Sequence, residues 1–234
     1  MLSRWYDPIL ILGAERTLPS KIASLLGLLG VDIRPVPLHI DATAARWEDH
    51  ELRHCQMDLL SEKISLRAFN LRVAILSEQR RRARAPWAMA SSYSADVLVP
   101  MLSHYLSPLV LWCQCEPSLA ASLLLNVQPA TSGWDTTDAM ALCTRRHEAL
   151  DHWLKDYQVL PLNGHAILDR EPGLIDQLID FCGLSPTAGQ LYQAMQYRPS
   201  HQQGAHDEEK ENDRRNGQAV RHNGSDVPRQ QVSS

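Results

Sequence analysis

Residues Gly13 to Ser20 could bind an anion, because a short apolar run precedes them and a helical pattern follows them. A loop that leads from a buried strand into a helix presents backbone N–H groups and the positive end of the helix dipole. No GxxxxGK[ST] pattern can be written here, because Leu18 stands in the place of its second glycine. Pro19 also lacks an N–H donor. The residues therefore predict a loop with the position of a phosphate-binding loop, in which some of the residues that would contact the phosphate are replaced.

The elements expected around this loop alternate between strands and helices. Apolar runs predict strands at residues 8–12, 31–37, 87–91, 109–115 and 165–169. Helical spacing predicts a helix that Gly30 ends and further helices over residues 47–82, 96–106, 117–125, 138–157 and 173–181. We therefore expect an α/β fold, a three-layer parallel sheet with helices on both faces. Ligands of such sheets collect at the carboxyl ends of the strands.

The composition changes near residue 199 and divides the chain into two parts. Residues 1–199 are expected to form one α/β domain. Residues 200–234 carry almost no large apolar side chains. Such a segment buries too little surface to offset its ordering entropy, so we expect a disordered polar tail.

Charge and hydropathy exclude several classes of protein. The formal net charge of −4 and the pI near 6.2 argue against a nucleic-acid binder, which would normally be basic. No run of about 18 apolar residues occurs, so we expect no membrane span. The apolar run near the N-terminus is too short for a signal peptide, and we expect a cytoplasmic protein.

The cysteines and histidines do not form a metal-binding pattern. The five cysteines are scattered, and Cys113-Gln-Cys115 is tighter than the usual CxxC pair. We interpret them as reduced thiols of the core. His147 and His152 are five residues apart, on different faces of their predicted helix. No metal cofactor is expected.

The order and spacing of several weak motifs resemble the bacterial sulfotransferase family over residues 8 to 199. The first loop of that family typically runs G-x-x-R-S-G-T-S, which Gly13, Arg16 and Ser20 match, with Thr17 in place of a serine. Three later segments are also similar to the family's pattern: Leu25–Val31, Trp47–Leu60 and Leu109–Leu123. The spacing from the last of these to His147–Leu150 and on to Phe181–Leu184 agrees as well. The resemblance implies a P-loop-like fold.

The family resemblance also implies a donor and a set of contacts. It implies transfer of a sulfuryl group from 3′-phosphoadenosine 5′-phosphosulfate to a hydroxyl or amine acceptor, which could be a small molecule or a saccharide. In that family the first loop holds the 5′-phosphosulfate, and an arginine and a serine further along hold the 3′-phosphate. By this resemblance the donor-binding residues are Gly13, Arg16, Thr17, Ser20 and Ser122.

The chain departs from the family pattern at several of these contacts. Leu18 replaces the loop glycine, and Pro19 replaces a threonine and its N–H donor. Gln114 or Cys115 stands where the 3′-phosphate arginine belongs. The K-D-P-R segment is matched only by Trp87 followed by Ala-Met-Ala-Ser-Ser.

Sulfuryl transfer needs a base that takes the proton of the acceptor. Glu48, Asp49 and His54 lie in a segment that could face the loop, and we choose Glu48 as the catalytic base, with Arg16 as the loop cation. The alternative is that each is a solvated charge. The arginine-rich run at residues 79–84 is interpreted as the solvated end of a helix.

Three functions therefore remain after the sequence analysis. The first is a sulfotransferase, and the second is an inactive relative that acts as a binding or assembly partner of another protein. The third, a nucleotide kinase, is disfavoured because the Walker lysine is absent.

Overall fold

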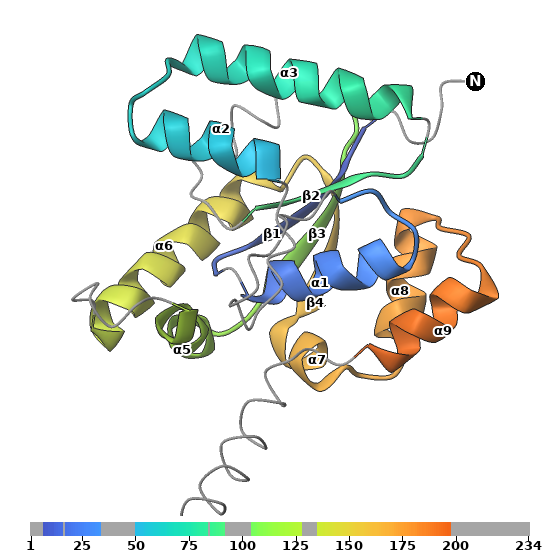
Figure 1. Ribbon diagram of the computed structural model, residues 1–234. Helices are drawn as coiled ribbons and strands as arrows, with labels where there is room; N and C mark the ends of the chain where they lie inside the picture. Colours follow the sequence, from blue (N-terminus) through green and yellow to red (C-terminus); the bar gives the residue numbers. More distant parts are fainter. Residues whose placement is uncertain are drawn as a thin grey trace, which may run out of the picture. The chain divides into compact units, whose positions relative to one another are not determined.

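Four parallel strands form a sheet in the order β2-β1-β3-β4 (Figure 1). The computed structural model describes residues 7–15, 17–33, 50–83, 85–91, 104–127 and 135–197. The strands are β1 (Ile9–Gly13), β2 (Ala88–Ser91), β3 (Leu109–Gln114) and β4 (Gln158–Asn163). The helices are α1 (Thr17–Leu28), α2 (His50–Leu60), α3 (Leu66–Arg82), α5 (Pro117–Val127), α6 (Thr136–Trp153), α7 (Gly164–Asp169), α8 (Leu174–Cys182) and α9 (Ala188–Gln196).

Helices cover both faces of the sheet, and β1 is therefore buried along its whole length. Alternate residues of a strand point to opposite faces, so Ile9 and Ile11 enter one core and Leu10 and Leu12 enter another. The first core includes side chains of α1, α7, α8 and α9, and the second includes side chains of α2, α3 and α6. The three-layer α/β fold that the sequence predicts is confirmed.

The order of the strands places the loops after β1 and β3 next to each other. Gly13 at the end of β1 is paired with Cys113 of β3, which is paired in turn with Leu162 of β4. The chain passes from β1 to β2 on one side and then crosses β1 to reach β3 on the other side. Ligands of open α/β sheets bind at this kind of switch point, so the loop after β1 has the expected position.

The predicted strand at residues 165–169 is wrong, because these residues form α7 and the strand β4 lies before them. The side chain of Asn163 accepts a hydrogen bond of 2.8 Å from the N–H of His165 and so caps α7. The strand itself, QVLPLN, is only partly buried and contains a proline. The apolar run of three residues at 166–168 does not distinguish a short helix from a strand.

Other boundaries differ less from the prediction. The helix predicted over residues 47–82 is two helices, because Glu62 has a left-handed backbone and Ser65 caps the start of α3. The segment predicted as a second strand contributes one bridge, between Asp32 and Trp87. Residues 104–106, the end of a predicted helix, are not helical, and the sequence did not predict α9. Residues 34–37, residues 96–103 and the tail lie outside the described residues. Within the described parts of the chain, no helix is long and apolar enough to cross a membrane.

Gly164 joins β4 to α7 at a point where the backbone packs closely against β3. A Cβ atom at Gly164 would lie 2.6 Å from Cβ of Cys115 and 3.0 Å from the carbonyl oxygen of Gln114. Both neighbours belong to the end of β3 or its continuation, so they cannot move without shifting the strand. This contact fixes the end of β4 beside the loop that follows β1.

We therefore expect Gly164→Ala to destabilise the fold by about 1–3 kcal/mol, the usual cost of overpacking. Gly189→Ala is the matched control, since nothing lies within 4 Å of a Cβ at Gly189 in α9. That variant should be neutral or more stable by up to about 1 kcal/mol. Urea denaturation measures both free energies of unfolding, and equal values for the two variants would contradict the close packing at Gly164.

Candidate functional site

The loop after β1 contains a buried carboxylate that the sequence analysis did not assign. The side chain of Glu15 is only 1% exposed. Its carboxylate accepts a hydrogen bond of 2.5 Å from the N–H of Thr17 and another of 2.7 Å from the N–H of Leu18. These are the first two N–H groups of α1, so Glu15 occupies the place at the helix N-terminus where a bound anion would lie.

The remaining donors of the first turn are also altered. Proline at position 19 has no N–H, so three of the first four backbone positions of α1 offer no donor to a ligand. The side chain of Ser24 donates to the carbonyl oxygen of Ser20 at 2.9 Å, which is a contact within the helix. The N–H groups at the start of α1 are therefore bound by the carboxylate of Glu15 instead of by a ligand.

Burial and the neighbouring charges act on Glu15 in opposite directions. Burial raises the pKa of the Glu15 carboxyl, while the N–H groups of Leu18 and Thr17 and the charge of Lys21 lower it. Lys21 is half-buried, and burial lowers its pKa while Glu15 raises it. Arg146 of α6 donates a hydrogen bond of 3.1 Å to the carbonyl oxygen of Ala14, directly before Glu15. Lys21 and Arg146 are thus basic residues near the loop that the sequence analysis missed.

Leu18 and Pro19 point into the core and fill space beside the loop. A Cβ at Gly13 would lie 2.8 Å from Cγ of Pro19, so only glycine fits against the proline ring. A Cβ at Gly164 would lie 3.0 Å from Cδ1 of Leu18. Both residues are buried, and Leu18 is 1% exposed. The two departures from the family loop are therefore packing residues of this fold.

The structure brings together only part of the predicted donor site. Gly13, Thr17 and Ser20 lie at the start of α1, as expected, although Thr17 donates its N–H to Glu15. Ser122 lies exposed on α5, next to Ala121, which shares a core cluster with Ala14 of the loop. Arg16, Glu48 and Asp49 lie outside the described residues. His54 is exposed on α2.

Three thiols lie near Glu15 at the same edge of the sheet. Burial is the largest cause that raises the pKa of Cys113, Cys115 and Cys143, and the charge of Glu15 raises each of them further. The pKa of Cys115 rises to about 12. The thiols are free and protonated at neutral pH, so they are poor nucleophiles and poor metal ligands. Among the residues that the structure describes, no group of acidic, histidine or cysteine side chains could hold a metal ion.

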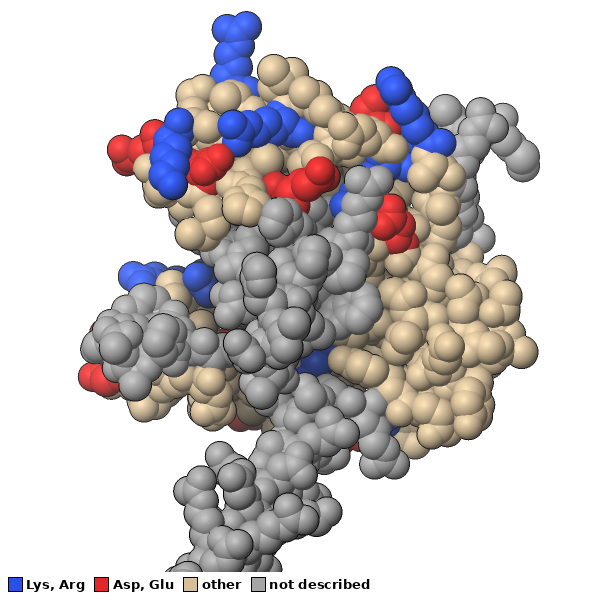
Figure 2. All heavy atoms as spheres, in the orientation of Figure 1, with Lys and Arg blue, Asp and Glu red and all other residues tan. Residues whose placement is uncertain are grey.

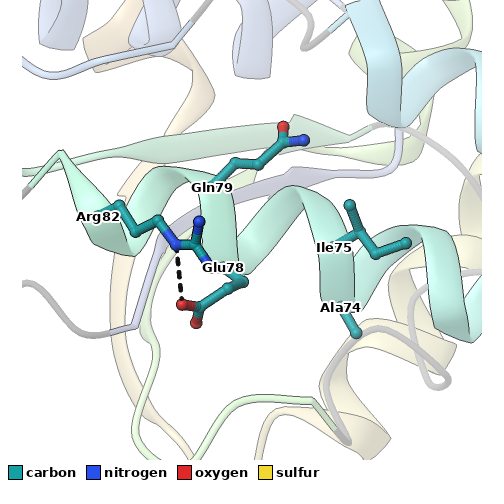
Figure 3. A pocket seen from close by; sticks show the side chains of 5 residues that line it. All are labelled: Ala74, Ile75, Glu78, Gln79 and Arg82. Carbon is teal, nitrogen blue, oxygen red and sulfur yellow. Dashed lines mark hydrogen bonds and ion pairs between the residues drawn. The ribbon is translucent and has the colours of Figure 1, made fainter.

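A hollow of about 390 Å³ lies along α3, on a different element from the loop after β1 (Figure 3). It is lined by Ala74, Ile75, Glu78, Gln79 and Arg82. Glu78 and Arg82 form an ion pair of 3.2 Å across one turn of the helix. The lining residues that the structure describes include no nucleophile, so we assign the hollow no chemistry.

Two solved structures share this fold. The chain superposes on the "Sulfotransferase Domain from the Curacin Biosynthetic Pathway" with a TM-score of 0.58 and 11% identity, over 82% of this chain and 79% of that one. It superposes on the "Sulfotransferase Domain from the Synechococcus PCC 7002 Olefin Synthase" with a TM-score of 0.55 and 13% identity, over 84% and 80% of the two chains. No family model and no curated protein sequence matches the chain. The fold is therefore sulfotransferase-like, which confirms that part of the sequence resemblance.

The position of Glu15 predicts a specific dependence of stability on pH. A carboxyl whose pKa is raised in the folded state binds more protons there than in the unfolded state, so its contribution to stability is lost as the pH rises. Relative to Glu15→Gln, the native chain should lose stability as the pH rises from about 4.5, the unperturbed value, through the raised pKa. Urea denaturation of both proteins across this range measures the difference.

Glu15→Ala provides the second arm of this test. This change leaves the N–H of Leu18 buried without its acceptor, and we expect it to cost about 1–3 kcal/mol near pH 4.5. The cost should become smaller at higher pH, because the native chain loses stability there and Glu15→Ala has no carboxyl to ionise. Glutamine keeps one acceptor oxygen and should cost less. A difference between the native chain and Glu15→Gln that does not vary with pH would contradict the burial of this carboxyl.

Proposed function

We propose that this chain is a sulfotransferase-fold protein whose first loop does not hold a nucleotide sulfate donor, and that it acts as a binding or assembly partner of other proteins. The observation that carries the proposal is the carboxylate of Glu15 on the N–H groups of Thr17 and Leu18. A 5′-phosphosulfate and a buried carboxylate cannot both occupy the N-terminus of α1, because like charges at contact distance repel.

Displacing Glu15 would be costly for a ligand. The ligand would have to break two hydrogen bonds to a charged group, each of which contributes about 1.5–3 kcal/mol. It would also have to move a carboxylate that is surrounded by core side chains. The N–H groups of Thr17 and Leu18 that it gains would only replace the bonds to Glu15 that it breaks, and Pro19 offers no additional donor.

The contact to the 3′-phosphate is also missing. Gln114 ends β3 and Cys115 follows it, so neither of the two candidate positions carries a guanidinium group. Losing one charge-assisted hydrogen bond weakens binding about ten- to a hundredfold, at 1.4 kcal/mol per factor of ten. The described residues thus do not fit 3′-phosphoadenosine 5′-phosphosulfate, and we derive no transfer step through it.

A second candidate function is sulfuryl transfer to a hydroxyl or amine acceptor. The observation in its favour is Arg146, which donates to the carbonyl oxygen of Ala14 and so places a cation beside the loop. Under this alternative Arg16 and Glu48 would have the roles given by the family resemblance. Binding of the nucleotide distinguishes the two functions.

Calorimetric titration with adenosine 3′,5′-bisphosphate tests the proposal. We expect no measurable binding to the native chain, because Glu15 occupies the anion position. Glu15→Ala should bind the nucleotide weakly, and inorganic sulfate should compete for the vacated N–H groups. Asp151→Ala, which removes an exposed acid of α6, is the control for the change in net charge. Tight binding by the native chain would overturn the proposal and favour sulfuryl transfer.

A further inference from the structure

The outer face of α3 is apolar at its centre. Leu71 is 62% exposed and Ile75 is 49% exposed, and Ala74 lies between them on the same side of the helix. The opposite side of α3 is buried through Phe69 and Val73. Figure 1 shows α3 as the outer helix beside α2, and Figure 3 shows Ala74, Ile75, Glu78 and Arg82 among the residues that line the hollow along α3. This outer face comprises Arg67, Leu71, Ala74, Ile75, Glu78 and Arg82.

Exposed apolar side chains are concentrated in this region. Half of the ten large apolar side chains that are exposed in the described residues belong to α2 and α3: Met57, Leu60, Leu66, Leu71 and Ile75. A single exposed leucine needs no explanation, whereas a cluster of them indicates an interaction surface. On α3 the spacing of three and four residues makes Leu71, Ala74 and Ile75 contiguous.

Charges of opposite sign flank the apolar centre. Arg67 lies one turn before Leu71, is exposed, and forms no ion pair within the described residues. Glu78 lies one turn after Ala74 and is half-exposed, with Arg82 as its neighbour. Figure 2 shows acidic and basic side chains side by side over this part of the surface. Arg82 lies one turn beyond Glu78, so in an antiparallel pair of these faces Arg67 of each copy can reach Glu78 of the other as a second cation beside Arg82.

We propose that the outer face of α3 binds the same face of a second copy of this chain, with the two α3 helices antiparallel about a two-fold axis between residues 72 and 73. In this register Leu71 faces Ala74 of the second copy, and Arg67 faces its Glu78. Each contact occurs twice, because a two-fold interface is self-complementary. The small side chain of Ala74 allows the two helices to approach closely. This inference does not depend on the function proposed for the loop after β1.

Other occupants fit the face less well. The sequence of residues 200–234 has almost no large apolar side chains, so it offers little apolar surface to match Leu71 and Ile75. Among the described residues, the Glu78–Arg82 ion pair leaves Arg67 as the uncompensated charge of this face, whereas binding to a nucleic acid or to an anionic lipid surface requires several basic side chains. A second copy satisfies both the apolar centre and the charges of both signs.

The expected dimer is weak. A helix of 17 residues is about 25 Å long, so a single helix pair buries less than the roughly 1,600 Å² of a standard interface. We expect a dissociation constant on the order of 10–100 μM, in the range of a transient complex. Sedimentation equilibrium of the full chain from about 1 to 300 μM covers this range.

Leu71→Glu should weaken the dimer at least about tenfold, because it places two like charges beside the apolar centre. Tyr192→Glu is the matched control, since Tyr192 is 65% exposed on α9 and lies outside the proposed face. This control should dimerise like the native chain. Arg67→Glu should also weaken the dimer, and adding Glu78→Arg should restore it, because the reversed pair attracts again.

Cysteine cross-linking tests the register. In the proposed arrangement the two Leu71 residues are three positions apart along the helices, about 4.5 Å, whereas the two Leu66 residues are about 20 Å apart. Mild oxidation should therefore link two copies of Leu71→Cys through a disulfide and leave Leu66→Cys monomeric. A chain that is monomeric throughout the concentration range, or a dimer that Leu71→Glu and Arg67→Glu do not weaken, would overturn the proposal.

Discussion

The site depends on how the N-terminus of α1 satisfies its unpaired N–H groups. Every helix must find acceptors for its first four N–H groups, and a helix that starts inside a protein cannot rely on water. Here Glu15 supplies both oxygens of a buried carboxylate, and Pro19 removes one further donor. A buried carboxylate is tolerable only where donors and the helix dipole stabilise it, so the carboxylate and the helix start depend on each other.

The packing around the loop follows from this arrangement. Glu15 occupies the start of α1, and Leu18 and Pro19 turn into the core. Pro19 then requires glycine at position 13, and Leu18 lies against Gly164 at the start of α7. Gly13, which in the sequence suggests a ligand-binding turn, is explained by its close contact with Pro19, and Gly164 by its contacts with Cys115, Gln114 and Leu18. Gly13 thus matches the sequence pattern of a phosphate loop, although in the structure it packs against the side chain of Pro19.

The parts of the fold that are buried on both faces could be predicted from the sequence, and the parts at its edge could not. The continuous apolar runs of β1 and β3 and the helical spacing of α1 leave few alternatives. The edge strand β4 has mixed polarity, and α7 has only six residues, so local pattern does not separate them. Glu15 could not be identified as the cap, because it precedes the helix by two positions and its burial depends on β3 and α6.

A sulfotransferase-like fold at 11–13% identity constrains the sheet more than it constrains the loop. The sheet requires many buried contacts, whereas donor recognition depends on a few N–H groups and cations, which can change without disturbing the core. The outer face of α3 is less constrained by the core, since Leu71 and Ile75 are exposed. Its apolar side chains contribute little to the stability of a monomer and gain a role only when another surface covers them.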